Sequence, residues 1–227
     1  MTAFFRHARV WPSARGRAAL ASGICDAAAQ AALSLWDARD WPLVVRRSDA
    51  DELQVDDTLA VGLALPPSLG KRRFKFRLPR DAIAAHAPPF ALDDVVAVLG
   101  PPLQRALTPL ARAATRARIV LRVFGSVAWQ AQTGLDYLHT DSDLDLLMQP
   151  TTSTELQSTI ALLERVAPNL AIRLDGEIVF PGGDAVAWRE WARENGPAHV
   201  LVKSAARVAL MARSDLAARL RLRKLAA

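Results

Sequence analysis

The sequence predicts an α+β protein, with a mixed sheet and its helices in the C-terminal half and a smaller α/β domain before it. Short apolar runs of strand type alternate with segments of helical spacing along the chain. Five prolines between residues 79 and 102 mark a connector. Beyond it, acidic and apolar residues alternate in two runs, which is typical of strands with one face in a core. We therefore divide the chain into an N-terminal domain (1–80), a linker and helix (81–117) and a C-terminal domain (118–227).

In the N-terminal domain, the patterns predict an Ala-rich helix over 17–35 and strands over 5–11, 41–46, 58–65 and 71–78. The last strand alternates in charge, with basic residues on one face and apolar residues on the other: Lys71, Arg73, Lys75 and Arg77 against Phe74, Phe76 and Leu78. A cationic face of this kind suits a solvated edge strand or the floor of an anion site, and the sequence favours neither.

The linker is expected to hold helices over 81–86, 93–99 and 103–117. The elements predicted for the C-terminal domain are strands over 119–124, 143–148, 170–180, 185–188 and 199–202, and helices over 126–132, 151–166, 188–195 and 203–225. The last of these is a long basic helix.

Composition narrows the class of protein. The net charge is +6, and 25 of the 29 basic residues are arginine, which matches phosphate oxygens bidentately. Aromatic residues are few and do not interleave with the basic clusters, so we expect no nucleic-acid partner. The chain has one cysteine, no apolar run of about 18 residues and no secretory signal. We therefore expect a cytoplasmic protein with no membrane partner.

Two short motifs carry the chemistry. Gly125-Ser126 follows a strand and opens a helix, and the backbone N–H groups of such a turn favour anions. Asp143 and Asp145 follow and share one face of a strand, because side chains alternate along it. Two carboxylates about 4 Å apart repel by roughly 4 kcal/mol at an effective dielectric near 20, so the pair favours a bound cation. Hard oxygen ligands favour Mg²⁺, with one or two ions at the site.

The strand over 170–180 offers a third carboxylate. Its apolar side chains face one way, while Arg173, Asp175 and Glu177 face the other. If this strand neighbours the one that carries Asp143, either acidic residue could complete a metal site. We place Asp175 ahead of Glu177 as the third ligand, on facing alone.

The order of strand, Gly-Ser turn, helix and Asp-x-Asp strand resembles the nucleotidyltransferase superfamily with a polymerase β-like core. The interval between the motifs is longer than usual there. The extra residues form an insert, Thr133 to Asp141. With this insert, the chain resembles the malonate decarboxylase holo-acyl-carrier-protein synthases, also called phosphoribosyl-dephospho-CoA transferases. The residues that carry this resemblance most specifically are Gly125-Ser126-Val127-Ala128-Trp129-Gln130, Thr133-Gly134-Leu135, Tyr137-Leu138 and Ser142-Asp143-Leu144-Asp145-Leu146-Leu147. Further matches cover nearly the whole length: Arg6-His7, Trp11, 42–47, Gly62-Leu63, Lys71-Arg72-Arg73, 175–178, 188–190 and Val202-Lys203.

The resemblance implies an enzyme that moves a 2′-(5″-phosphoribosyl)-3′-dephospho-CoA group from its 5″-triphosphate precursor to a serine of an apo acyl-carrier subunit. Diphosphate is released. Asp143 and Asp145 would be the catalytic, metal-binding pair, and Gly125 and Ser126 would hold the leaving diphosphate. The C-terminal domain would be catalytic, and the N-terminal domain would bind the donor or the carrier.

Other basic residues are candidates for binding the triphosphate or the CoA moiety of the donor: Arg46, Arg47, Lys71, Arg72, Arg73 and Lys203. For each of them, the alternative to ligand binding is a solvated position on the surface. Two other functions stay open at this stage. The chain could be another small nucleotidyltransferase that moves AMP to a small molecule or protein, or a binding protein without catalysis on the same scaffold.

Overall fold

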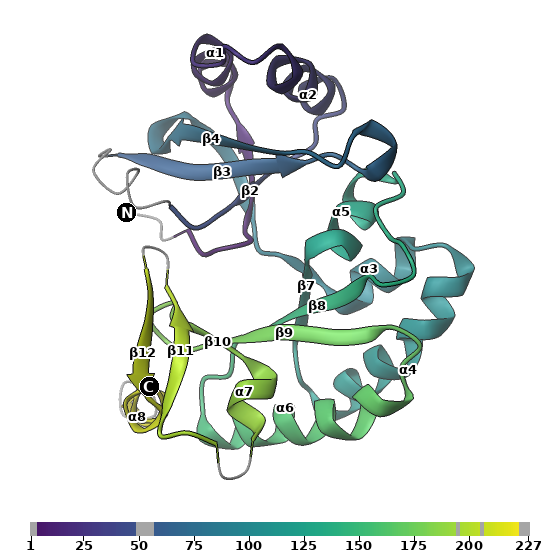
Figure 1. The fold of residues 1–227 in the computed structure, drawn as a ribbon, viewed down its shortest axis with the longest axis vertical. Helices are drawn as coiled ribbons and strands as arrows, with labels where there is room; N and C mark the ends of the chain where they lie inside the picture. Colours follow the sequence, from purple (N-terminus) through teal and green to yellow (C-terminus); the bar gives the residue numbers. More distant parts are fainter. Residues whose placement is uncertain (1–3, 49–56, 194–195, 205–206, 223–227) are drawn as a thin grey trace. The chain divides into compact units, whose positions relative to one another are not determined.

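The computed structural model describes residues 4–48, 57–193, 196–204 and 207–222 (Figure 1). These residues gather in two compact units. The first unit comprises the chain up to Pro89 together with Gln132–Tyr137, and the second comprises Phe90–Ala131 and the chain from Leu138 onward. The predicted α+β class is confirmed, since both units combine a sheet with helices. None of the helices in the described part of the chain is long and apolar enough to cross a membrane.

The first unit is a five-stranded antiparallel sheet, in the order β4-β3-β2-β1-β5, with two helices. Its elements are β1 (Arg9–Pro12), α1 (Ala14–Ser22), α2 (Ala27–Ala38), β2 (Leu43–Val45), β3 (Thr58–Ala64), η2 (Pro67–Leu69), β4 (Arg73–Pro79), η3 (Arg80–Ala82) and β5 (Ile83–Ala87).

The expectation of a single helix over 17–35 is wrong, because the chain forms two helices there. Helix α1 ends at Gly23, and Asp26 caps the start of α2 by accepting a hydrogen bond from the backbone N–H of Ala28 at 2.8 Å. That bond, together with the ion pair to Arg72, lowers the pKa of the Asp26 carboxyl. A glycine followed by an aspartate is a stop and a start signal for helices, and it outweighs the high helix propensity of the alanines.

The alternation expected over 71–78 is confirmed in β4. Phe74, Phe76 and Leu78 are buried, whereas Arg73 and Lys75 on the other face are exposed. Strand β4 lies at the edge of its sheet. Lysine and arginine on an edge strand oppose pairing with another chain, so this position accounts for the charges without a ligand. An anion-binding role for the strand stays a prediction.

The second unit is a seven-stranded mixed sheet in the order β12-β11-β10-β9-β8-β7-β6. Its pairs are antiparallel except for β8 and β9, which are parallel neighbours. The elements are β6 (Phe90–Ala91), α3 (Leu92–Val98), α4 (Pro101–Ala117), β7 (Leu121–Phe124), α5 (Gly125–Thr133), β8 (Asp143–Met148), α6 (Ser153–Val166), η4 (Ala167–Asn169), β9 (Arg173–Val179), β10 (Ala185–Ala187), α7 (Trp188–Ala192), β11 (His199–Lys203), β12 (Val208–Ala212) and α8 (Arg213–Leu222).

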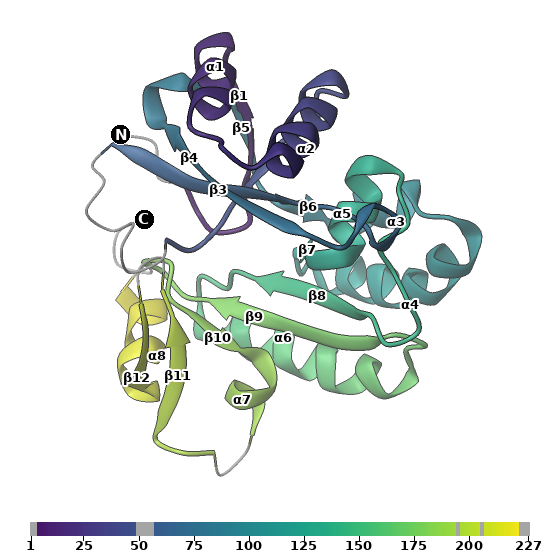
Figure 2. The ribbon, with the colours of Figure 1, turned by 45° about the horizontal axis from the view of Figure 1, so that its top comes forward.

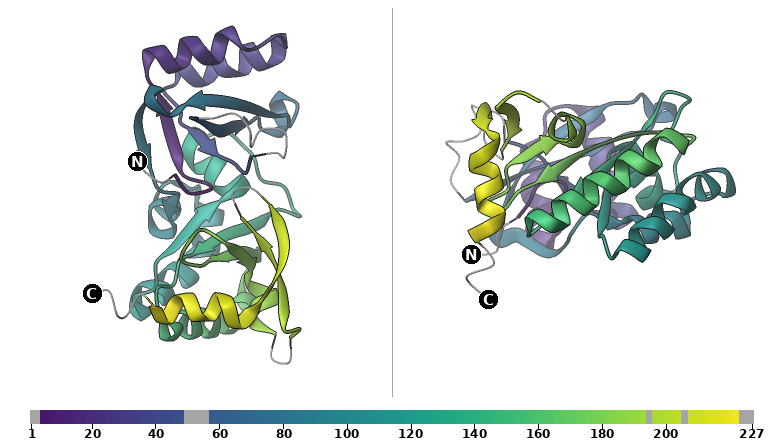
Figure 3. Two further views of the ribbon diagram at one scale, coloured as in Figure 1. Left: turned by 90° about the vertical axis from the view of Figure 1, so that its left-hand side faces the viewer. Right: turned by 90° about the horizontal axis from the view of Figure 1, so that it is seen from below.

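Helices cover one face of this sheet and build the core of the second unit there. Figures 2 and 3 show α6 running beneath β8 and β9, with α4 and α8 on the same side. Leu144 and Leu146 of β8, Leu174 of β9 and Leu163 of α6 are fully or almost fully buried in this core. Because side chains alternate along a strand, burial of this face turns the odd-numbered residues of β8 and β9 to the other face.

Two further expectations are wrong. Residues 81–86, expected as a helix, form the short helix η3 and the strand β5, because His86 pairs with Val10 of β1. The long helix expected over 203–225 is replaced by the β11–β12 hairpin and α8, and its last residues lie outside the described part. An apolar run such as 208–212 suits a helix or a strand equally, and pairing with β11 decides the outcome.

The segment expected as linker and helix divides between the two units. Residues 81–89 belong to the first unit, while Phe90–Ala117 belongs to the second. Val95 of α3 and Leu107 and Leu110 of α4 are fully buried in the core of the second unit. These helices are therefore part of that fold rather than of a free connector.

The segment Gln132–Tyr137 is tied to the first unit by two hydrogen bonds. The Tyr137 hydroxyl donates to the carbonyl of Ala64 at 2.7 Å, and the Gln132 amide donates to the carbonyl of Pro42 at 3.1 Å. Burial raises the pKa of the Tyr137 phenol to about 12, against an opposing hydrogen bond with Thr133. The protonated phenol is thus the form that the folded state favours.

Tyr137 is the single tyrosine of the chain, so its ionisation can be followed directly. We expect a titration midpoint near pH 12 in the folded protein and near 10.0 in denaturant. The stabilisation that the neutral phenol provides is complete below pH 10 and is lost as the pH rises toward 12, because unfolding then releases a proton. Tyrosinate absorbance in the near ultraviolet measures both midpoints, and a folded-state midpoint at the denatured value would contradict this assignment.

Candidate active site

The acidic residues lie on β8 and β9 on the face that α6 does not cover. In the register of the two parallel strands, Asp143 lies opposite Arg173, and Asp145 lies opposite Asp175. Neighbouring strands are about 4.8 Å apart, so four charged side chains share a small area. The expected adjacency of these two strands is confirmed, and so is the facing of Asp143, Asp145 and Asp175. The metal-binding and catalytic roles of these residues stay predictions.

Gly125 lies directly against the Asp145 carboxylate. Strand β7 pairs antiparallel with β8, which puts Phe124 opposite Asp145 and starts α5 at the next residue. Gly125 has φ +69°, and a Cβ at this position would lie 1.9 Å from Oδ2 of Asp145. A side chain there would therefore displace the carboxylate. Gly125 also brings the N-terminus of α5, with Ser126 in its first turn, beside the acidic face, where the helix dipole favours an anion.

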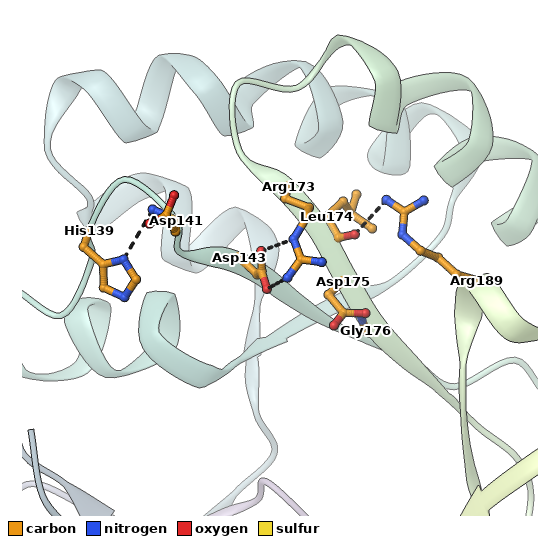
Figure 4. Close-up of polar contacts among 8 residues, drawn as sticks. All are labelled: His139, Asp141, Asp143, Arg173, Leu174, Asp175, Gly176 and Arg189. Atoms are coloured by element: carbon orange, nitrogen blue, oxygen red, sulfur yellow. Dashed lines mark hydrogen bonds and ion pairs between the residues drawn. The ribbon is translucent and has the colours of Figure 1, made fainter.

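Arg173 forms a two-pronged ion pair with Asp143 (Figure 4). Its Nε donates to Oδ1 of Asp143 at 2.6 Å, and its Nη2 donates to Oδ2. The Arg173 side chain is 70% exposed and that of Asp143 is 20% exposed. The hydrogen bond and the charge of Asp143 raise the pKa of the Arg173 guanidinium, and Asp175 and Asp145 add smaller contributions. The guanidinium is thus the cation bonded to Asp143 in the structure, and its charge also interacts with those of Asp175 and Asp145.

The two candidates for the third carboxylate differ in their surroundings. Asp175 lies beside the Arg173–Asp143 pair in Figure 4, and its Oδ1 accepts a hydrogen bond from the N–H of Gly176 at 2.8 Å. Glu177 is 6% exposed and accepts a hydrogen bond from Nζ of Lys203 at 3.0 Å. Along the strands, Glu177 lies two residue pairs beyond the pair of Asp145 with Asp175, opposite Leu147. Position and pairing therefore favour Asp175 over Glu177.

The side chains of this site suit a hard cation in type and facing, and Gly125 leaves room for the Asp145 carboxylate. Nevertheless, in the described ranges no three side chains of His, Cys, Asp or Glu are grouped closely enough to hold a metal ion as they stand. Both oxygens of Asp143 are bonded to Arg173. A metal ion that binds Asp143 would compete with the Arg173 guanidinium for this carboxylate.

The other predicted phosphate ligands lie in different parts of the fold. Lys203 is in the second unit, where it pairs with Glu177. The remaining five belong to the first unit: Arg46, Arg47, Lys71, Arg72 and Arg73. Arg46 donates to the carbonyls of Val61 and Arg47, at 3.2 and 2.9 Å, and Arg72 pairs with Asp26 at 2.7 Å. Arg47, Lys71 and Arg73 are exposed. Their role as donor ligands stays a prediction.

A surface pocket of about 460 Å³ lies elsewhere in the second unit, between η4 and α7. The residues that line it include Glu164, Trp188, Arg189 and Arg193, and none of the carboxylates discussed above. The Arg189 guanidinium stacks over the Trp188 ring and donates to the carbonyl of Leu174 at 3.0 Å. We place the candidate active site at the carboxylates instead, because β8 and β9 bring several charged side chains together there on one face of the sheet.

No role was expected for Arg173 from the sequence. The signal was present, because alternation along the strand puts Arg173 on the same face as Asp175 and Glu177. What the sequence could not show is the register that sets Arg173 opposite Asp143. His139, in the loop before β8, accepts a hydrogen bond on Nδ1 from the N–H of Asp141 at 3.3 Å (Figure 4).

Comparisons with known proteins match both units to one family. Residues 5–89 match the N-terminal domain and residues 91–214 the C-terminal domain of the family described as phosphoribosyl-dephospho-CoA transferase MdcG. A protein of that name from Xanthomonas campestris pv. campestris (strain 8004) is 39% identical over 198 residues, which cover 87% of this chain and 89% of the relative. One from Bradyrhizobium diazoefficiens is 36% identical over 208 residues, covering 92% and 90%. One from Xanthomonas axonopodis pv. citri is 38% identical over 212 residues, covering 93% and 95%. No solved structure matches the chain.

Proposed function

Because the chain belongs to the phosphoribosyl-dephospho-CoA transferase family, we propose that it moves a phosphoribosyl-dephospho-CoA group onto a protein serine. The acceptor that we propose is the apo acyl-carrier subunit of malonate decarboxylase, and the donor is the 5″-triphosphate of the group. The single observation that carries the assignment of the site is the arrangement of Asp143, Asp145 and Asp175 on neighbouring strands beside Gly125. All four residues lie within the matched C-terminal domain.

The residues of this face suit a nucleotidyl transfer, and the core that we propose for it is of the polymerase β type. Asp143, Asp145 and Asp175 would hold Mg²⁺, which supplies charge neutralisation for the triphosphate when it is bound. The backbone N–H groups at the start of α5 and the Ser126 hydroxyl favour the leaving diphosphate there. The site then aligns the seryl oxygen with the α-phosphorus, so that the new O–P bond forms as the bond to diphosphate breaks, and the hydroxyl proton passes to solvent.

The cationic surface gives the proposal a second support. The chain carries a net charge of +6, and an acidic carrier protein would be attracted to it. Electrostatic steering of this kind raises the rate of association and is weakened by salt. Several basic residues of the first unit are exposed, Arg47, Lys71 and Arg73 among them, and could bind the donor or the carrier.

Intact-mass spectrometry of the acceptor tests this function. The apo acyl-carrier subunit is mixed with the enzyme, Mg²⁺ and the triphosphate donor, and we expect one serine to gain the mass of the prosthetic group. In a parallel reaction, ATP replaces the donor. A gain of AMP from ATP, with none from the triphosphate donor, would contradict the proposal and support a different nucleotidyl transfer. No gain from either substrate would contradict catalysis on this acceptor.

A further inference from the structure

We propose that Arg173 competes with the metal ion for Asp143, so that the ion pair weakens metal binding until the ion displaces the guanidinium. This inference rests on the metal-assisted mechanism proposed above and adds a residue that governs metal binding. Arg173 acts here as a positioning residue, because it works through Asp143.

The geometry of the pair carries the inference. A carboxylate has two oxygens, and Arg173 occupies both oxygens of Asp143, one through Nε and one through Nη2. Strand register fixes this arrangement, since Arg173 and Asp143 are direct partners across the parallel strands. A metal ion that takes Asp143 as a ligand meets the repulsion of this positive charge on the same carboxylate, so the ion and the guanidinium compete for it.

Because Arg173 is exposed, its charge interacts with the carboxylates and does not contribute to the core. Its side chain is 70% exposed at the start of β9, so it contributes little packing. Three carboxylates, those of Asp143, Asp175 and Asp145, stabilise its positive charge. The guanidinium bonded to Asp143 thus brings a positive charge to the face where a cation would bind, a face on which no three described side chains are grouped closely enough to hold a metal ion.

The pair also has a consequence for the carboxylates in the absence of metal. Like charges on neighbouring strands repel, and a bidentate guanidinium relieves that repulsion without a bound ion. The same contact lowers the affinity for metal, since the free energy of the ion pair must be given up first. An exposed ion pair is worth little, so the expected penalty is about 5-fold in the dissociation constant.

Direct Mn²⁺ binding tests the inference without relying on activity. Electron paramagnetic resonance of free Mn²⁺ gives the dissociation constant for the full-length protein with no donor present. We expect Arg173→Gln and Arg173→Met to bind Mn²⁺ about 5-fold more tightly than the wild type. Arg189→Gln is the matched control: it removes the same charge from a nearby arginine, which donates to the carbonyl of Leu174 and, within the described part of the chain, bonds to none of the three carboxylates. It should change the constant by less than about 2-fold, because solvent screens the more distant charge.

Equal dissociation constants for the wild type and both Arg173 variants would overturn the inference. So would an equal tightening in Arg189→Gln, because that result would reduce the effect to net charge. If none of the proteins binds Mn²⁺, this inference fails together with the metal-assisted mechanism. The mass-spectrometric assay of the acceptor decides independently whether the transfer itself takes place.

Discussion

Asp145→Asn should lower the rate of prosthetic-group transfer by at least about 100-fold, the usual cost of removing a group that stabilises charge in a transition state. Asp145 is central among the acidic residues, since it lies opposite Asp175 on the neighbouring strand, contacts Gly125 and shares its face with Asp143. The amide keeps the shape of the side chain but removes its negative charge. The initial rate of the acceptor's mass gain, at saturating donor and Mg²⁺, measures the effect.

Asp184→Asn is the matched control for this variant. It makes the same chemical change at a carboxylate that is 18% exposed and paired with Arg219 at 2.7 Å, in the turn between β9 and β10. We expect a small loss of stability and a nearly unchanged rate of transfer. If Asp145→Asn retains wild-type activity with an unchanged circular dichroism spectrum, Asp145 is not a catalytic residue.

Gly125→Ala should lower the rate by about 100-fold, because the new Cβ would lie 1.9 Å from Oδ2 of Asp145 and must displace it. A misplacement of about 1 Å in a catalytic group can have an effect of this size. The substitution also puts a side chain at φ +69°, which costs about 1–3 kcal/mol in the free energy of unfolding. Transfer rates and urea denaturation measure the two effects separately.

Gly134→Ala separates backbone strain from displacement of the carboxylate. Gly134 has nearly the same backbone conformation, φ +71°, but a Cβ there would meet no atom within 4 Å. This variant should lose a similar amount of stability and keep most of its activity. Equal losses of activity in the two variants would show that strain, rather than contact with Asp145, explains the Gly125 result.

The parts of the site set by local sequence could be predicted from the sequence. Strand β8 has the predicted bounds, Asp143–Met148, because a run with acidic residues on one face and leucines on the other fits a half-buried strand. The same reasoning gave the face that holds Asp175 on β9. The start of α5 beside the carboxylates was also expected, since Gly125-Ser126 follows an apolar strand.

The parts that depend on distant pairing could not be predicted in this way. The 208–212 run became β12 because it pairs with β11, and 83–87 became β5 because it pairs with β1. The local propensity of a segment carries no information about the distant strand with which it will pair. The ion pair of Arg173 with Asp143 depends likewise on the parallel register of β8 and β9, which joins residues 30 positions apart.

One measurement tests most directly whether the carboxylates of β8 catalyse the transfer. In a single reaction, the prosthetic group gained by the acceptor and the diphosphate released are both quantified, for the wild type and for Asp143→Ala and Asp145→Ala. We predict equal amounts of the two products with the wild type and neither product with either variant. Modification of the acceptor at the wild-type rate by both variants would contradict the account and place the site elsewhere in the chain.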